Sequence, residues 1–177
     1  MKRIVIAGTA GSGKSALARR LGAQLRLPVI HLDALNWEPG WKPVGTETLR
    51  SRLTAAISGD AWITDGNYAA VTFDLRLPRA DLFIWVERPM LQCMGRVLRR
   101  ALKSHFHTKE DLACGCKERF DGRFFQRIRY IANFERTNRP RIEAMRMKYG
   151  PNVPVTILRG DAAISAFLEN HAPSGGA

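Results

Sequence analysis

The sequence predicts an α/β fold in which a parallel sheet carries helices on both faces. Three observations point to it. Short runs rich in β-branched residues alternate along the chain with longer segments of helical spacing, which is the pattern of parallel strands joined by crossover helices. A glycine-rich stretch, GTAGSGKS at 8–15, joins the first such run to the first helical segment. No stretch approaches the roughly 18 apolar residues of a membrane-spanning helix, so we interpret the apolar runs as buried strands.

Five strands are expected, at RIVIA (3–7), VIHLD (29–33), AWIT (61–64), LFIWV (82–86) and VPVTIL (153–158). Continuous apolar runs of this length are typical of strands buried on both faces. Helices are expected at 15–25, 46–57, 89–103, about 121–148 and 161–170. In the first helix, Leu17, Leu21 and Leu25 recur at helical spacing, and Pro28 closes the unit. The 177 residues fit one domain at 1–170, followed by a disordered tail at 171–177.

The chain is strongly basic. Its 28 Lys and Arg residues exceed its 16 Asp and Glu residues, which gives a formal charge of +12. A positive field attracts phosphate in any form, so nucleotides, nucleic acids and anionic lipids all fit the charge alone. Three cysteines, an odd number, without an export signal favour a cytoplasmic location, and no membrane partner is expected.

The stretch at 8–15 has the form of a phosphate-binding loop. It matches the pattern G-x-x-x-x-G-K-[ST] and lies between a predicted strand and a predicted helix. Glycines let successive backbone N–H groups point at anionic oxygens, and the helix adds its positive N-terminal end. The alternative is a glycine-rich turn that only connects strand and helix. We predict a nucleotide site formed by Gly8, Ala10, Gly11, Ser12, Gly13, Lys14, Ser15 and Ala16.

The residues around this loop favour a kinase among the P-loop proteins. Lys14 can reach the β- and γ-phosphates of ATP, and the Ser15 hydroxyl is a hard oxygen ligand for Mg²⁺. The third strand ends ITDG, so Asp65 is a lone carboxylate, whereas ATP-hydrolysing motors usually end a strand in an acidic pair. A lone carboxylate suits Mg²⁺ positioning without water activation. A GTPase is not favoured, because TKED at 108–111 follows polar residues rather than a buried strand.

Several stretches resemble the adenylate-kinase-like family of small P-loop kinases. They are GTAGSGKS, HLDALNWEPGW (31–41), WITDGNY (62–68), RLPRADLFIWVERP (76–89) and RYIANFERTNRP (129–140). The whole chain looks most similar to the branch called FlaR-type "DNA topology modulation" proteins. The resemblance implies a P-loop NTPase fold with a five-stranded parallel sheet of order 2-3-1-4-5 and a small lid at about 104–128. It also implies ATP and Mg²⁺ as cofactors, with Asp65 on the Mg²⁺ side, in a monomer or a homodimer.

The resemblance also implies roles for arginines. Arg96 and Arg100 would lie near the adenine and the phosphates. Arg119, Arg129 and Arg136 would clamp the transferring phosphoryl group from the lid side, because its charge spreads over three equatorial oxygens. The alternative is that arginines on long helices only solvate a face.

One departure concerns the acceptor. The family's acceptor loop D-G-[FY]-P-R is DGNYA here, so its arginine is missing. Arg76 or Arg79 would have to replace it. A monophosphate acceptor is therefore in doubt.

Asp33 is the residue expected to orient the acceptor hydroxyl or to act as its general base. It ends the second predicted strand, at the sheet edge where ligands of doubly wound sheets bind. Its alternative role is an N-cap of the next segment. Trp37 and Trp41 follow closely and either wall a pocket or belong to the core.

The lid region holds a His/Cys cluster, HFHTKEDLACGC at 105–116. His105, His107, Cys114 and Cys116 could bind zinc, but gaps of one residue are tight for tetrahedral geometry. We expect a metal-free lid.

Together these features predict an enzyme, an ATP- and Mg²⁺-dependent kinase that phosphorylates a small acceptor. The alternative is a nucleotide-binding regulatory protein associated with DNA. The charge permits nucleic-acid binding, but no recognisable DNA-binding motif is present.

Overall fold

The computed structural model describes residues 1–103 and 121–171. The main strands are β1 (Arg3–Gly8), β2 (Val29–His31), β5 (Trp62–Asp65), β6 (Leu82–Glu87) and β7 (Val155–Arg159), and a short hairpin consists of β3 (Trp37–Glu38) and β4 (Lys42–Pro43). The helices are α1 (Lys14–Leu25), α2 (Leu32–Asn36), α3 (Thr46–Ala56), α4 (Ala69–Arg76), α5 (Met90–Lys103), α6 (Gly122–Ala132), α7 (Arg139–Tyr149) and α8 (Gly160–Asn170). Arg119, the His/Cys cluster and TKED lie outside the described residues.

Five parallel strands form one sheet in the order β2-β5-β1-β6-β7. The central strand β1 pairs with β5 on one side, Ile6 beside Asp65, and with β6 on the other, Gly8 beside Val86. The predicted parallel sheet is therefore confirmed. Its order is the predicted 2-3-1-4-5 when the two short hairpin strands, which were not predicted, are left out of the numbering.

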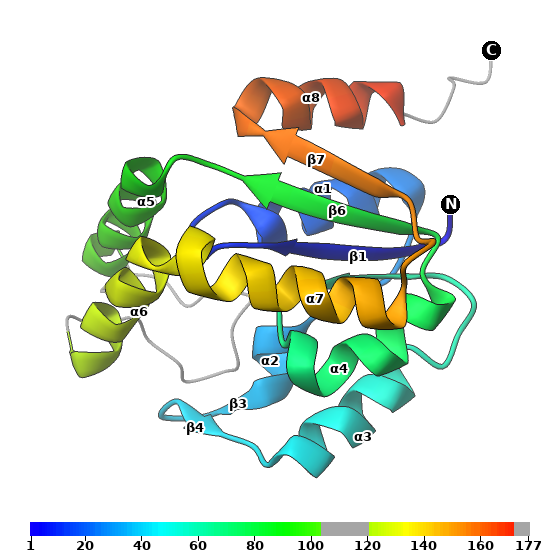
Figure 1. The fold of residues 1–177 in the computed structure, drawn as a ribbon, viewed down its shortest axis with the longest axis horizontal. Helices are drawn as coiled ribbons and strands as arrows, with labels where there is room; N and C mark the ends of the chain where they lie inside the picture. Colours follow the sequence, from blue (N-terminus) through cyan, green and yellow to red (C-terminus); the bar gives the residue numbers. More distant parts are fainter. Residues whose placement is uncertain (104–120, 172–177) are drawn as a thin grey trace.

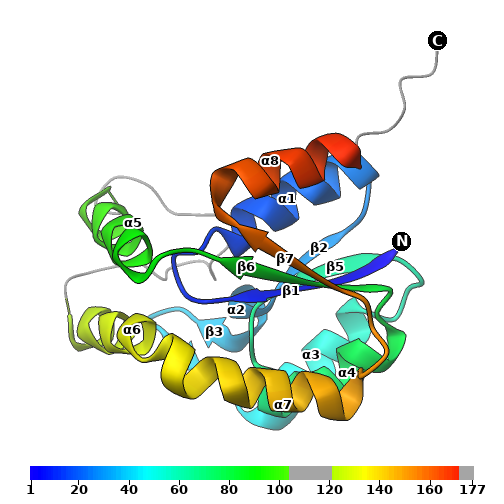
Figure 2. The ribbon, with the colours of Figure 1, turned by 45° about the horizontal axis from the view of Figure 1, so that its top comes forward.

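Helices cover both faces of the sheet, and side chains of β1 alternate between them. Ile4 and Ile6 pack in the core under α1 and α8, whereas Val5 and Ala7 pack in the core under α3, α4 and α7. Figure 2 shows α1 and α8 side by side above the sheet and α3, α4 and α7 below it. Because both faces are covered, every side chain of a central strand is buried, which explains the continuous apolar runs.

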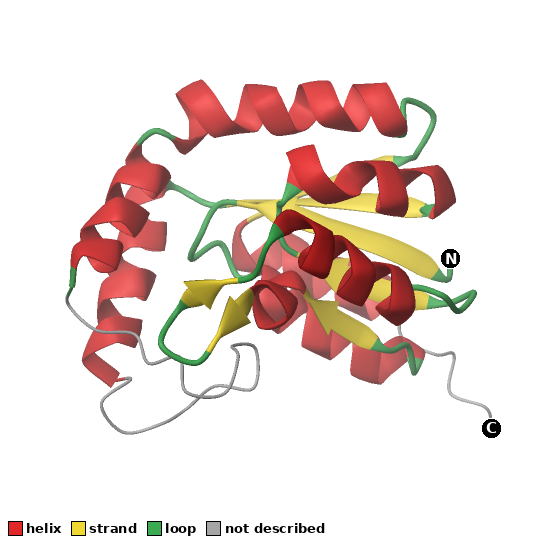
Figure 3. Ribbon diagram, turned by 90° about the horizontal axis from the view of Figure 1, so that it is seen from below, coloured by secondary structure: helices red, strands yellow, loops and turns green. Residues whose placement is uncertain are grey.

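The carboxyl ends of the parallel strands share one edge of the sheet. Helices α5 and α6 lie beyond that edge (Figure 1). The β3–β4 hairpin lies at the same end of the molecule, as the view from below shows (Figure 3). This edge is where ligands of parallel α/β sheets bind.

The second strand ends earlier than predicted. VIHLD was expected to be extended throughout, but β2 ends at His31 and α2 begins at Leu32. Leu32 and Asn36, four residues apart, are both buried, which is the spacing of one helical face. Asp33 therefore lies in a short helix rather than at a strand end.

The long helix predicted at about 121–148 is interrupted. It consists of α6, a π-helical turn at Phe134–Asn138, and α7. Pro140 has no N–H to donate to the carbonyl four residues earlier, so a continuous helix cannot run through it. Within the π-helical turn, the Asn133 carbonyl oxygen accepts from both the Thr137 amide at 2.9 Å and the Thr137 hydroxyl at 2.8 Å. Residues 122–128, part of the predicted lid, belong to α6.

Helix α4 was not predicted at all. Its buried residues are Ala69, Thr72, Phe73 and Arg76, so half of the buried face is polar and gave no apolar pattern. A 3₁₀ turn at Leu77–Arg79 follows it directly.

Candidate functional site

The loop between β1 and α1 needs glycine for its shape. Gly8, Gly11 and Gly13 have φ values of +146°, +80° and +104°, which side chains rarely adopt. A Cβ on Gly8 would lie 2.4 Å from the Val86 carbonyl oxygen, and one on Gly11 would lie 2.5 Å from the Cys93 carbonyl oxygen. The loop therefore lies closer to β6 and α5 than a side chain would allow.

The N-terminus of α1 is open to an anion. Gly13 caps the helix in a left-handed conformation, and no side chain accepts a hydrogen bond there. The first-turn N–H groups, of Lys14, Ser15 and Ala16, have no partner within the helix and lie at the positive end of its dipole. This arrangement binds phosphate in many proteins.

Two hydroxyls of the loop lack a partner. Thr9 Oγ1 and Ser12 Oγ are buried and have no hydrogen bond among the described residues. The Ser12 amide donates to the Thr9 carbonyl oxygen at 3.3 Å, so the loop partly closes on itself. Buried polar atoms without a partner are uncommon and need a ligand, an ion or water to complete them. The loop as a whole, with Ala10 and Gly11 at its turn, fits a nucleotide phosphate.

Lys14 lies across this loop. Its Nζ donates to the Thr9 carbonyl oxygen at 2.8 Å. Burial lowers the pKa of Lys14, and the charges of Asp65 and then Asp33 oppose that change, while Arg100 adds to it. Charged residues from three other elements, α2, β5 and α5, therefore lie within electrostatic range of the same ammonium.

Asp65 ends β5 beside the loop and is buried. Its Oδ1 lies 2.5 Å from His31 Nδ1, on the neighbouring strand β2, where the register pairs the two residues. The histidine thus fixes the orientation of the carboxylate, and the sequence analysis missed it. Asp65 and the Ser15 hydroxyl in the first turn of α1 are the hard oxygen ligands available to Mg²⁺ here.

Asp33 is exposed and lies in the first turn of α2. His31, not Asp33, is the N-cap of that helix, so the alternative capping role is wrong. Its Oδ1 accepts a hydrogen bond from the Tyr68 hydroxyl at 2.7 Å. Burial, together with the Asp33 charge, raises the pKa of Tyr68, so this hydroxyl stays protonated and donates to the carboxylate.

Asn67 was also missed, although it links three parts of the site. Its Oδ1 accepts from the Gly8 amide at 3.1 Å, and its Nδ2 donates to the Gly8 carbonyl oxygen at 3.0 Å. The same Nδ2 lies 2.8 Å from the Tyr130 hydroxyl on α6. The loop after β5 therefore fixes the first glycine of the phosphate loop and contacts α6.

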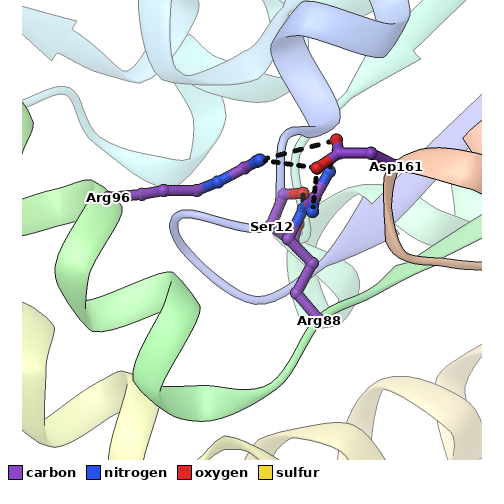
Figure 4. A network of polar contacts seen from close by, with 4 residues as sticks. All are labelled: Ser12, Arg88, Arg96 and Asp161. Carbon is purple, nitrogen blue, oxygen red and sulfur yellow. Dashed lines mark hydrogen bonds and ion pairs between the residues drawn. The ribbon is translucent and has the colours of Figure 1, made fainter.

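Arg88 lies beneath the phosphate loop and was not predicted either. Its Nε donates to the Ser12 carbonyl oxygen at 2.6 Å, and its guanidinium forms a two-pronged ion pair with Asp161, at the start of α8 (Figure 4). Arg96, predicted near the nucleotide, reaches the same carboxylate at 3.2 Å. Hydrogen bonding to Arg88 and the charges of both arginines lower the pKa of Asp161. Both guanidinium groups lie within 4 Å of the position a Cβ on Gly13 would take.

The structure describes two of the three arginines predicted on the lid side. Arg129, in the last turn of α6, and Arg136, in the π-helical turn, are exposed and form no ion pair with any described residue. Neither is fixed in a catalytic geometry. Arg119 lies outside the described ranges.

Neither arginine considered as a replacement in the acceptor loop is available for that role. The buried Arg76 guanidinium donates to the backbone oxygens of Gly66 at 3.1 Å and Asn67 at 2.6 Å. Arg79 donates to the Ile57 carbonyl oxygen at 2.5 Å, and it precedes β6, at the opposite edge of the sheet. Both stabilise backbone that would otherwise lack partners.

Two kinds of feature, a metal-holding cluster and a membrane-spanning helix, are absent from the described residues. No group of three or more His, Cys, Asp or Glu side chains in 1–103 and 121–171 is arranged to hold a metal. No helix in those ranges is both long and apolar enough to cross a membrane.

No protein-family model matches the chain, and no curated protein matches it. Solved structures match the chain. A shikimate kinase from Bacteroides thetaiotaomicron is 16% identical with a TM-score of 0.55, over 96% of this chain and 95% of that one. A shikimate kinase from Acinetobacter baumannii, in complex with shikimate, is 15% identical with a TM-score of 0.56, over 96% of this chain and 90% of that one. At these identities the likeness shows the fold alone.

Proposed function

We propose that this chain is an ATP- and Mg²⁺-dependent phosphotransferase that moves the γ-phosphoryl group of ATP to a hydroxyl of a small acceptor. One observation carries the proposal: a glycine-shaped phosphate loop lies at the same sheet edge as two carboxylates, Asp65 and Asp33, both within electrostatic range of Lys14. The fold shared with two shikimate kinases, which by name phosphorylate a small molecule, supports it.

In this proposal, separate groups of residues bind the phosphates and Mg²⁺. The loop amides and the N-terminus of α1 bind the phosphates, and Lys14 turns from the Thr9 carbonyl to the β- and γ-phosphates. Ser15 and Asp65 would hold Mg²⁺, with His31 orienting the Asp65 carboxylate. When bound there, Mg²⁺ would supply positive charge that offsets the charge of the phosphates.

The transfer itself needs one bond made and one broken. The acceptor hydroxyl oxygen bonds to the γ-phosphorus, the bond from that phosphorus to the bridging oxygen breaks, and its electron pair leaves with ADP. Asp33 accepts the hydroxyl proton and releases it to solvent. Arginines from α5, α6, the π-helical turn and the lid region supply positive charge to the transferring group, namely Arg96, Arg100, Arg119, Arg129 and Arg136.

Replacement of Lys14 tests the proposal. Charge-assisted hydrogen bonds contribute about 1.5–3 kcal/mol, so Lys14→Ala should raise the Kd for ATP roughly 10- to 100-fold and abolish ATP consumption. Assays against nucleosides, nucleotides, sugars and polyols measure that consumption. Lys2→Ala, an exposed lysine at the opposite end of β1, is the matched control and should behave as wild type. Equal turnover in wild type and Lys14→Ala contradicts the proposal.

The FlaR-type resemblance and the charge of +12 support a second candidate, a nucleotide-binding regulator associated with DNA. Binding of DNA that weakens with salt does not discriminate, because any protein of this charge binds phosphate. ATP consumption does. If no small acceptor stimulates it but DNA does, the regulatory function is the better account.

A further inference from the structure

We propose that the acceptor is an uncharged hydroxylated ring compound, of the kind found in nucleosides and sugars, rather than its phosphate ester. The inference rests on the proposed function for the position of the transferred phosphoryl group. Three observations around Asp33 carry it. They are an aromatic wall, backbone strain within that wall, and arginines whose guanidinium groups already have protein partners.

The aromatic wall consists of Trp37, Trp41 and Tyr68. The two tryptophan rings of the β3–β4 hairpin lie 5.5 Å apart, edge to face at 72°. Both are partly buried rather than part of the core. The Tyr68 hydroxyl hydrogen-bonds Asp33 and also lies within hydrogen-bonding range of Trp37. From α6, the Arg127 guanidinium lies 5.5 Å above the Trp41 ring. Through Tyr68 the wall contacts Asp33, the carboxylate whose charge acts on Lys14.

Two members of this wall have a strained backbone. Trp41 and Tyr68 have φ values of +61° and +38°, and for bulky residues this region is unfavourable. Among the described residues the other non-glycine case is Arg26, the C-cap of α1, where such a conformation is common. Strained residues concentrate at functional sites, where the surrounding structure holds them in place. Two aromatic residues held in this way beside one carboxylate indicate a recognition surface.

Among the described residues, the guanidinium groups on this side of the site already contact the protein, and that of Arg127 lies above the Trp41 ring. Phosphate recognition typically uses arginine in two-pronged contacts. Each of the four arginines between positions 29 and 79 donates to the protein itself: Arg50 to Asp74, Arg52 to Glu38 and the Leu35 carbonyl, Arg76 to the Gly66 and Asn67 carbonyls, and Arg79 to the Ile57 and Gly59 carbonyls. A phosphate here would instead meet the carboxylates of Asp33 and Asp65, which repel it.

An uncharged ring with hydroxyl groups fits the same surroundings. Aromatic side chains pack against the flat face of a ring. The Asp33 oxygen that does not bind Tyr68 can accept from a hydroxyl of the ring, which is the group that receives the phosphoryl. The wall and Asp33 therefore offer a stacking surface and one acceptor of a hydrogen bond, and the Arg127 guanidinium at the wall is already placed over Trp41.

Matched pairs of compounds test the inference by binding, without any need for turnover. Calorimetry compares adenosine with AMP, thymidine with TMP, and glucose with glucose 6-phosphate, and adds shikimate as an anionic ring. We expect at least one uncharged member to bind, and to bind about tenfold more tightly than its phosphate ester, a difference of about 1.4 kcal/mol. Tighter binding of the esters, or binding by no uncharged compound at millimolar concentration, overturns the inference.

Two variants locate the preference. Trp37→Leu should weaken binding of the uncharged ring about fivefold to tenfold, in line with the contribution of aromatic packing. Asp33→Asn should reduce the ratio of the Kd of each phosphate ester to the Kd of its uncharged partner, because it removes the charge that repels the ester. Asp60→Asn, an exposed carboxylate before β5 at the opposite edge, is the control and should leave the ratio unchanged. If Asp33→Asn does not change this ratio of Kd values, the role assigned to the carboxylate is contradicted.

The two proposals fail in different ways. If the uncharged compounds bind with the expected preference but none is phosphorylated, the phosphotransferase proposal is wrong and the acceptor class stands. If a phosphate ester binds best and is phosphorylated, the enzyme proposal stands and the acceptor class is wrong.

Discussion

At the scale of single residues, the proposed acceptor chemistry rests on Asp33. Its carboxylate is exposed, is oriented by the Tyr68 hydroxyl at 2.7 Å, and acts electrostatically on Lys14. One oxygen is bound by Tyr68, and the other remains for a substrate hydroxyl. A carboxylate fixed in this way is suited to take a proton from that hydroxyl at the moment of transfer.

Asp33→Asn should lower kcat by about a hundredfold or more if Asp33 is the general base, because general-base catalysis contributes on that order. The Kd for ATP should stay nearly unchanged, since the phosphate loop is intact. Steady-state kinetics and calorimetry measure the two quantities separately. A loss confined to the KM of the acceptor would mean that Asp33 only positions the substrate.

The sequence predicted some site residues and missed others for a physical reason. Lys14 and Ser15 occupy fixed positions in a motif whose chemistry depends on side-chain type. Asn67 and Arg88 act on backbone atoms, the Gly8 peptide and the Ser12 carbonyl oxygen. Backbone acceptors leave no mark in the sequence, so nothing in the chain identified these two partners in advance.

At the scale of elements, the pair of Arg88 and Asp161 joins three parts of the fold. Arg88 follows β6, Asp161 begins α8, and the Arg88 Nε contacts the phosphate loop at Ser12. The Arg88 side chain is only 2% exposed, whereas Asp161 is 72% exposed. The buried arginine therefore connects the start of α8 to the phosphate loop through its bonds to Asp161 and to the Ser12 carbonyl oxygen.

Asp161→Asn should weaken ATP binding about tenfold, in line with the loss of a charge-assisted hydrogen bond. Most of the effect should appear in the KM for ATP rather than in kcat, because the loop loses its support while the transferring groups stay in place. Asp74→Asn is the matched control, since Asp74 forms a comparable two-pronged pair with Arg50 on the other face of the sheet. If both variants change only thermal stability, Asp161 has no positioning role.

A second ion pair predicts a pH dependence of stability. Partial burial acts to raise the pKa of Asp81, but the amides of Lys2 and Arg3 and the Arg3 guanidinium outweigh it and lower the pKa to about 2. A carboxyl with a lowered pKa in the folded state stabilises the protein above its unfolded pKa of about 4. That contribution is lost as the pH falls towards 2.

Thermal unfolding of Asp81→Asn tests this dependence. The variant should have a lower Tm than wild type at pH 7, and the difference should shrink steadily between about pH 4 and pH 2. A difference in Tm that stays constant over this range would show that the Asp81 charge is not its cause.

The sequence predicted those helices and strands that show a clear local pattern of apolar residues. All five main strands lie where continuous apolar runs indicated. Burial on both faces imposes that pattern on β1, β5 and β6, whereas β7 keeps Val155 and Ile157 exposed. The β3–β4 hairpin and α2 were missed, since strands of two residues and a helix of five are too short to show a period. Helix α4 was missed because Thr72 and Arg76, both polar, lie on its buried face.

At the scale of the whole molecule, each of the five parallel strands leads into one part of the proposed site. The phosphate loop follows β1, His31 ends β2 with Asp33 just after it, and Asp65 ends β5. Arg88 follows β6, and Asp161 follows β7. A parallel sheet brings all its carboxyl ends to one edge, so residues far apart in the sequence meet there.

This gathering also explains what the comparisons share with the chain. Two shikimate kinases share the fold at 15–16% identity. The acceptor side is built from α2, the hairpin and the loop after β5, which are the parts that local pattern predicts least. The fold and the glycine-rich loop were therefore predictable from the sequence, whereas the elements of the proposed acceptor site were not.

The central claim is that phosphoryl groups pass from ATP to a small hydroxyl compound. Following the γ-phosphate by ³¹P NMR in the presence of ATP, Mg²⁺ and the best-binding uncharged ring compound tests it most directly. We predict that ADP and a new phosphate ester of that compound appear in equal amounts, and that neither appears with Lys14→Ala. Release of inorganic phosphate alone, or no consumption of ATP by the wild-type protein with any acceptor, would contradict the account.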